Sequence, residues 1–280
     1  MRFFADLAAP PRPAWVPLID ALAASMEGCA SEALAEDATR WANAAPRAAR
    51  LVSADAVAIG FQPAEYAAAF AAAAAEPWNH PRLAALIETA HRLVDTVHPE
   101  RDVIVALTGP ALLARQALAA APERAALDAL KPGLVKTLEK LCACRLDMVV
   151  LDEDVAQAPF TATPDLRRFY NTLKNVTEYF GVALGLRVSG YAQAEDVAEA
   201  CGILKIGHLL LGAPAAGALP RPTLELLRSA RAAGWQSLGV PVDATPPEGV
   251  ASELPWYYIT AGQDTDVERL RQHGAALTRP

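Results

Sequence analysis

Three consecutive carboxylates end one of the most apolar stretches of the chain. Asp152, Glu153 and Asp154 follow directly on the run MVVL at residues 148–151. Like charges within a few ångströms resist joint ionisation, so one of these groups could keep a proton and act as an acid or base. The set could instead hold a cationic group of a ligand. Asp154 could also be solvated or cap the next helix, so Asp152 and Glu153 are the candidate catalytic residues.

A second unusual residue is Arg187, which interrupts the apolar run VALGLRVS at residues 182–189. A cation cannot be buried alone. We therefore expect Arg187 either to pair with a carboxylate such as Asp152 or to clamp an anionic group of a substrate.

Other common catalytic arrangements are missing from the sequence. Cys142-Ala-Cys144 is spaced more closely than the usual pair of zinc ligands, and no G-x-S-x-G elbow is present. None of the five histidines has a second ligand at metal spacing. His208 alone falls in an apolar run typical of a strand, near its beginning, which favours a core histidine. We expect neither a bound metal nor a serine nucleophile.

The elements that must position these residues alternate along the chain. Apolar, β-rich runs are followed by Ala- and Leu-rich helical stretches, as expected of parallel strands with crossover helices. Seven strands are expected at 56–61, 103–108, 147–152, 182–189, 206–212, 237–243 and 256–260, and an eighth could come from 1–5. No phosphate-binding loop follows the first of the seven, which favours a (β/α)8 TIM-type barrel over a doubly wound open sheet. We expect one barrel domain over 1–280, with 1–50 as an N-terminal helical and loop extension.

Barrels of this type carry their chemistry at the C-terminal ends of the strands. Polar residues at those ends are therefore the candidates for binding a substrate beside Asp152 and Glu153. They are Gln62, Thr108, Arg187, Tyr191, Asp243, Gln263 and Asp264.

Composition and charge indicate which kinds of binding partner are disfavoured. The chain has 280 residues, is 53% hydrophobic and carries a net charge of −7, which disfavours nucleic acid and anionic membranes. Pro10, Pro11 and Pro13 would break a signal-peptide helix, and no uninterrupted apolar run is long enough to span a bilayer. A cytoplasmic protein with a small-molecule ligand is expected.

Five segments, in order along the chain, resemble motifs of the catalytic domain of cobalamin-independent methionine synthase. They are ALTGPALLARQAL at 106–118, VVLDEDVAQ at 149–157, LRVSGYAQAEDV at 186–197, SLGVPVDATPPEG at 237–249 and WYYITAGQDTDVERL at 256–270. The resemblance extends to the superfamily that includes uroporphyrinogen decarboxylase and corrinoid-protein methyltransferases. It implies a (β/α)8 fold.

The resemblance also implies which residues of this chain stand at the family's substrate-binding and zinc-ligand positions. Asp152-Glu153 matches the D-E that lies beside the amino-acid substrate. The family's four zinc ligands fall on Val188, Gly190, a residue near Gly212, and Gln263, none of which is a His, Cys or Glu.

We therefore expect a divergent, metal-independent member of the superfamily that acts on a small polar substrate by methyl transfer or decarboxylation. No bound cofactor is expected, zinc least of all, although a folate or corrinoid could be the substrate. The alternative is a non-catalytic ligand-binding barrel or the partner subunit of a methyltransferase system. Homo-oligomerisation is left open.

Overall fold

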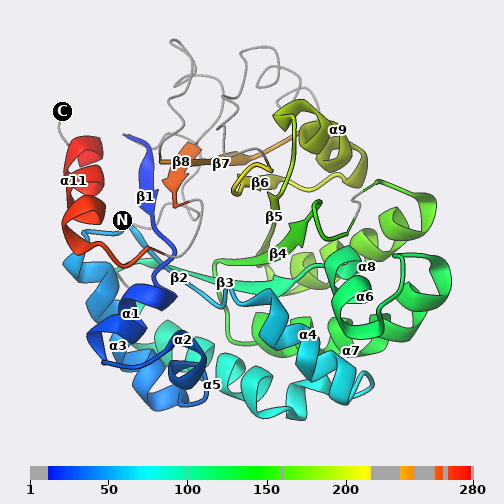
Figure 1. The fold of residues 1–280 in the computed structure, drawn as a ribbon, viewed down its shortest axis with the longest axis horizontal. Helices are drawn as coiled ribbons and strands as arrows, with labels where there is room; N and C mark the ends of the chain where they lie inside the picture. The colour runs from blue at the N-terminus through cyan, green and yellow to red at the C-terminus, as the bar shows by residue number, and fades with distance from the viewer. Residues whose placement is uncertain are drawn as a thin grey trace.

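The computed structural model describes residues 12–98, 100–158, 161–215, 234–242, 256–260 and 264–278. Eight parallel strands form one sheet in the order β1-β8-β7-β6-β5-β4-β3-β2 (Figure 1). They are β1 Ala14–Val16, β2 Ala56–Ile59, β3 Asp102–Thr108, β4 Met148–Asp154, β5 Ala183–Ser189, β6 His208–Leu211, β7 Ser237–Pro241 and β8 Trp256–Ile259. An isolated parallel bridge between Leu18 and Ala58 brings the two ends of the sheet together. The chain is a nearly closed (β/α)8 barrel, as expected.

The described helices lie along the outer face of the sheet (Figure 1). They are α1 Asp20–Met26, α2 Ser31–Leu34, α3 Ala38–Leu51, α4 Pro63–Ala72, α5 Pro81–Val97, α6 Pro110–Leu118, α7 Arg124–Cys142, α8 Pro164–Phe180, α9 Ala194–Leu204 and α11 Val267–Thr278, with the 3-10 turn η1 Pro77–Asn79. Four of them begin with proline, whose fixed φ suits the first helical position and whose missing N–H has no helical partner to lose. Thr163 also caps α8 by accepting the Leu166 amide at 3.2 Å, which fixes the start of the helix at Pro164.

The strands differ from the expected ones at their boundaries. The eighth strand is β1 at Ala14–Val16, whereas residues 1–5 lie outside the described part of the chain. This strand and helices α1 to α3 make up the described part of the segment expected as an extension. Strand β4 ends at Asp154, two residues beyond the expected end of this strand at residue 152. The three carboxylates therefore lie within the strand and alternate between its two faces.

The apolar side chains form two layers, one inside the barrel and one between sheet and helices. The inner layer is small and includes Ala58, Ala106, Met148 and Val150. The outer layer is larger and includes Val149 and Leu151 together with the buried faces of the helices. Successive residues of a strand point to opposite faces, so this alternation assigns an inward or outward direction to each residue.

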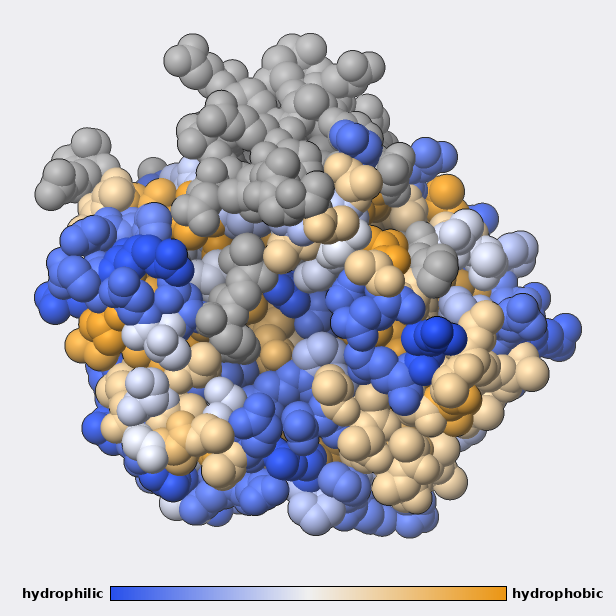
Figure 2. Space-filling model, viewed as in Figure 1, coloured by the Kyte–Doolittle hydropathy of each residue, from blue (hydrophilic) through white to orange (hydrophobic). Residues whose placement is uncertain are grey.

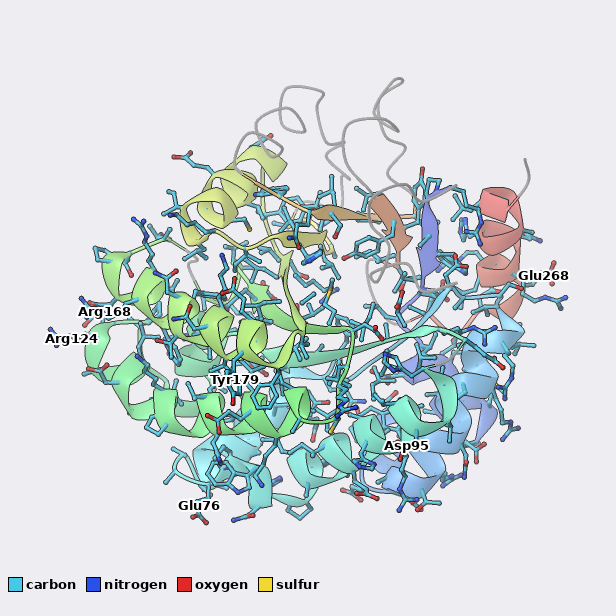
Figure 3. All side chains as sticks on the ribbon, turned by 180° about the vertical axis from the view of Figure 1, so that it is seen from behind. Glu76, Asp95, Arg124, Arg168, Tyr179 and Glu268 are labelled. Atoms are coloured by element: carbon cyan, nitrogen blue, oxygen red, sulfur yellow. The ribbon has the colours of Figure 1, made fainter. Side chains whose placement is uncertain are left out.

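The outer surface is mixed in character. Figure 2 shows hydrophilic and apolar side chains interspersed over the described part of one face. Seen from behind, the charged residues Glu76, Arg124 and Glu268 lie on the periphery of the molecule (Figure 3). Among the described helices, none combines the length and apolar character needed to cross a bilayer.

Candidate functional site

Asp152 points into the barrel at the C-terminal end of β4. Met148 and Val150 belong to the inner layer, so Asp152, two residues further on, faces the same way. It is 4% exposed. Its neighbours in register are Thr108 on β3 and Arg187 on β5. Three polar side chains from adjacent strands therefore stand at one level of the barrel, at the end where such folds bind ligands. We call this end the mouth.

Arg187 pairs with Asp152 across the two strands. Its Nη1 donates to both carboxylate oxygens, at 2.9 Å to Oδ1 and 3.0 Å to Oδ2. The Arg187 guanidinium carbon also lies 5.6 Å from the centre of the Phe61 ring, within cation–π range. Burial raises the pKa of Asp152, and the charge and hydrogen bonds of Arg187 oppose that rise. The carboxylate partner anticipated for Arg187 is thus Asp152.

Glu153 points the other way and serves a different purpose. Leu151 belongs to the outer layer, and Glu153, two residues further along the strand, faces the same way. The Glu153 side chain is buried there, with 1% of the residue exposed. Its two oxygens accept the amides of Ala111 at 2.9 Å and Leu112 at 2.7 Å, in the first turn of α6. The Tyr170 hydroxyl of α8 donates to the same carboxylate at 2.7 Å. Glu153 therefore caps α6 and ties it to α8.

Burial and hydrogen bonding compete at Glu153. Burial raises the pKa of Glu153, the three donors oppose the rise because they stabilise the charged form, and the net pKa is about 7. The positive end of the α6 dipole acts in the same direction as the donors. Of the two candidate carboxylates, only Asp152 faces the interior of the barrel.

The remaining candidates divide into those at the mouth and those elsewhere. Tyr191 is buried near Arg187 and donates to the Gly212 carbonyl at 3.2 Å, and burial raises its pKa to about 12. The hydroxyl of Thr108 donates to the Pro63 carbonyl at 2.9 Å. Gln62 precedes α4, and its buried Oε1 has no hydrogen-bond partner among the described residues.

The candidate Asp264 and the third carboxylate of β4, Asp154, each accept hydrogen bonds from their own segment of the chain. Asp264 accepts from Arg269 and from the amide of Asp266, at the start of α11. Asp154 accepts the Ala156 amide at 2.9 Å and the Gln157 side chain at 2.7 Å, so it stabilises the turn after β4. Asp243 and Gln263 lie outside the described residues.

The donor set at the family's zinc positions does not fit a zinc ion. Val188 belongs to the outer layer and points toward the helices, and Gly190 has no side chain. The inward-facing neighbours of Val188 are Arg187 and Ser189, which offer a guanidinium and a hydroxyl. Among the described residues, no group of three or more His, Cys, Asp or Glu is placed to hold a metal.

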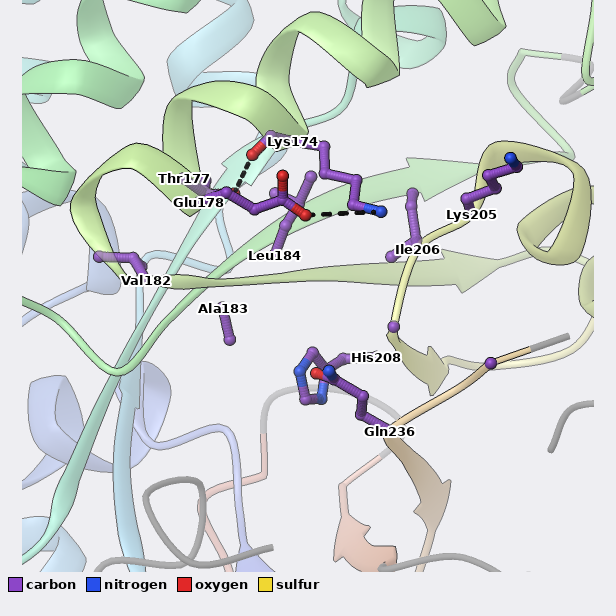
Figure 4. Close-up of a pocket in the computed structure, with 12 residues that line it drawn as sticks. Lys174, Thr177, Glu178, Val182, Ala183, Leu184, Lys205, Ile206, His208 and Gln236 are labelled. Atoms are coloured by element: carbon purple, nitrogen blue, oxygen red, sulfur yellow. Dashed lines mark hydrogen bonds and ion pairs between the residues drawn. The ribbon is translucent and has the colours of Figure 1, made fainter.

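His208 lies at the opposite end of the barrel from the mouth. Its Nδ1 is 2.7 Å from the Ser237 hydroxyl, and burial lowers its pKa to about 4. Nearby is a cavity of about 200 Å³ lined by the starts of β5, β6 and β7 and by residues of α8 (Figure 4). Lys174 and Glu178, 3.5 Å apart, line the same cavity from α8. His208 is a hydrogen-bonded core histidine, as the sequence predicts.

Two residues important to the mouth were missed by reasoning from the sequence. Phe61 was placed in the first expected strand, but β2 ends at Ile59 and the ring of Phe61 turns into the barrel. Asp20 is 1% exposed and accepts the Phe61 amide at 3.1 Å. Its only signal in the sequence is a carboxylate inside the apolar run WVPLIDALAA at 15–24.

Comparison with known proteins gives the fold a second line of support. No family model matches the chain, and no curated protein matches its sequence. Among solved structures, the chain is similar to a methyltransferase from Methanosarcina mazei, with a TM-score of 0.68 and 12% identity over 96% of this chain and 94% of that one. A putative phosphonomutase from Burkholderia cenocepacia gives a TM-score of 0.44 and 15% identity over 85% of this chain and 88% of that one. At these identities, the likeness to the methyltransferase shows a shared barrel fold.

Proposed function

We propose that the chain is an enzyme that acts on a small polar molecule at the mouth of the barrel, with Asp152 as the acid, base or cation-binding group. The observation that carries the proposal is the buried Asp152–Arg187 pair on inward-facing positions of two adjacent strands. Burying two charges costs several kcal/mol per ion before their attraction is counted, and apolar residues would fill the space at less cost. A ligand that uses these charges gives a reason to keep them.

Arg187 supplies the anion-binding side of the proposed site. A guanidinium presents its N–H donors in a planar fork that matches the geometry of a carboxylate or phosphate, and the two bonds to Asp152 described above come from one nitrogen, Nη1. In the proposed site, a carboxylate or phosphate of the substrate binds this guanidinium while Asp152 keeps its place. Asp152 is then held within reach of a protic or cationic group of the same molecule.

Glu153 has a supporting role in this proposal. Its contacts to Ala111, Leu112 and Tyr170 fix the strand that carries Asp152 against α6 and α8. The reaction class that the resemblance suggests is methyl transfer or decarboxylation. Zinc takes no part in the proposed chemistry, because Val188 and Gly190 supply no donor at two of the family's ligand positions.

The test combines a ligand screen with matched variants. Thermal-shift measurements with homocysteine, folates, cobalamin and porphyrinogens identify the ligand, and mass spectrometry of the incubated mixture identifies any methylated or decarboxylated product. Asp152→Asn should abolish turnover and keep the far-UV circular dichroism spectrum. Asp154→Asn is the matched control, since Asp154 lies on the same strand and binds its own turn. Full turnover by Asp152→Asn would overturn the assignment.

A ligand-binding barrel or partner subunit of a methyltransferase system is the second candidate, favoured by the lack of side-chain donors at Val188 and Gly190. It predicts a thermal shift that Arg187→Lys reduces, without product from any substrate in the panel. Metal analysis of the same protein completes the comparison. Stoichiometric zinc would contradict the metal-independent mechanism.

A further inference from the structure

Asp20 is a buried carboxylate that ties the end of β2 to α1. Its Oδ2 accepts the amides of Gly60 at 2.8 Å and Phe61 at 3.1 Å, and its Oδ1 accepts the indole N–H of Trp41 at 3.1 Å. A buried carboxylate is costly unless donors surround it. These contacts join α1, α3 and the end of β2 at one point.

The backbone that Asp20 binds makes a sharp turn. Gly60 has a φ of +85°, and a Cβ at this position would lie 2.9 Å from the Ala106 carbonyl oxygen. Only glycine fits both the left-handed conformation and the close approach. If β2 continued in regular alternation, Ala56 and Ala58 would face inward and Phe61 outward. Ala56 and Ala58 do face inward, but the turn at Gly60 redirects Phe61, which joins them in the inner layer.

The redirected ring contacts the proposed site. Phe61 is 7% exposed, and its ring centre lies 5.6 Å from the guanidinium carbon of Arg187. A planar guanidinium stacks favourably on an aromatic face, which restricts the rotamers open to it. Arg187 is thus held by Phe61 on one side and by Asp152 at Nη1.

We propose that Asp20 is a positioning residue for the mouth: it fixes the backbone of Gly60 and Phe61, holds the Phe61 ring against Arg187, and so keeps the guanidinium aligned with Asp152. Its importance for function rests on the function proposed above. The alignment itself can be measured without a ligand.

The test follows the titration of Asp152 by carboxyl ¹³C NMR in the full chain, with the signal assigned through Asp152→Asn. In Asp20→Asn we expect the pKa of Asp152 to rise, because a displaced Arg187 stabilises its charged form less well. Loss of the negative charge at Asp20 by itself acts in the opposite direction and lowers the pKa of a neighbouring acid. The sign of the change therefore separates positioning from simple electrostatics.

Phe61→Leu keeps an apolar side chain but removes the aromatic face, so it should raise the pKa of Asp152 in the same direction. In the Asp20→Asn/Phe61→Leu double variant, the shift should be no larger than in Phe61→Leu, since both act through one contact. Three other titratable groups interact electrostatically with Asp152, namely Glu153, Asp154 and Tyr170. These variants leave all three groups unchanged.

Asp55→Asn is the matched control. Asp55 precedes the same strand, binds Arg12 and accepts the Trp15 amide at 2.8 Å, but it lies at the opposite end of β2. We expect it to leave the Asp152 titration unchanged. An unchanged or lowered pKa of Asp152 in Phe61→Leu would overturn the proposal, even if Asp20→Asn failed to fold. The predicted rise in the pKa of Asp152 does not require a ligand. The positioning role of Asp20 and the proposed ligand site can therefore be refuted independently of each other.

Discussion

Removing Arg187 leaves the Asp152 carboxylate buried without its charged partner, and Arg187→Met does this with little loss of volume. The two side chains are 10% and 6% exposed, so water can replace little of the lost interaction. Breaking such a pair costs about 3 to 5 kcal/mol. Asp152 can escape part of the cost by taking up a proton. For a carboxyl group with an ordinary pKa of 3.8, that step costs about 4 kcal/mol at pH 7 and about 1.6 kcal/mol at pH 5.

Protonation therefore limits the destabilisation and makes it depend on pH. We expect Arg187→Met to lower the free energy of unfolding by about 4 kcal/mol at pH 7 and by roughly half as much at pH 5. Urea denaturation followed by circular dichroism at both pH values measures this difference. Asp152→Asn/Arg187→Met should recover most of the loss, because no buried charge remains in the pair. An equal loss at both pH values, or a loss below about 1 kcal/mol at pH 7, would refute this reasoning.

Three further changes test other parts of the structure. The pKa of Glu153 is raised to about 7 from 4.5, so the folded state holds the proton more tightly than the unfolded state. The contribution of this group to the free energy of unfolding is therefore fully present below pH 4.5 and declines by about 3 kcal/mol as the pH rises to 7. Glu153→Gln should remove that decline in urea denaturation, and an unchanged pH profile would count against a raised pKa. His208 behaves oppositely, since its pKa is lowered to about 4 from 6.5: its stability is present above pH 6.5 and declines by about 3 kcal/mol as the pH falls to 4. His208→Gln should flatten the acid side of the profile, and retention of the wild-type slope would contradict a buried neutral imidazole. Finally, a Cβ at Gly109 would overlap the Glu153 carboxyl group, so Gly109→Ala should cost about 1 to 3 kcal/mol, while Gly207→Ala, with only a side chain at 3.2 Å, should cost less. Equal melting temperatures for the two variants would show that Glu153 does not occupy the position described.

The fold could be predicted from the sequence because its signal is repeated along the chain. Each of the seven expected strands overlaps a strand of the barrel, since parallel strands buried on both faces are apolar throughout. The eighth expected strand, at 1–5, lies outside the described residues. Strand β1 was not anticipated, because it is only three residues long and AWV between prolines carries no strand pattern of its own. Its pairing with β8 depends on residues more than two hundred positions away.

The site was predictable only in part, because residue type does not give side-chain direction. Asp152 and Glu153 are adjacent in sequence, and the sequence alone treats them as equivalent. The alternation of β4 separates them, since a shift of one residue moves a side chain from the mouth to the helix layer. The pair of Asp152 with Arg187 could be anticipated from the need to neutralise a buried cation. The turn at Gly60 could not, because it depends on contacts from Asp20 and Ala106.

The most direct test is a crystal structure of the protein with the compound that gives the largest thermal shift in the ligand panel. We predict that its anionic group lies against Arg187 and that a protic or cationic group lies within hydrogen-bond distance of Asp152, at the C-terminal mouth of the barrel. Two other hollows offer well-defined alternatives: the cavity beside Lys174 and His208, and the groove of about 410 Å³ between Trp78 and Cys144. A ligand bound in either of these, with the Asp152–Arg187 pair untouched, would contradict the proposed site.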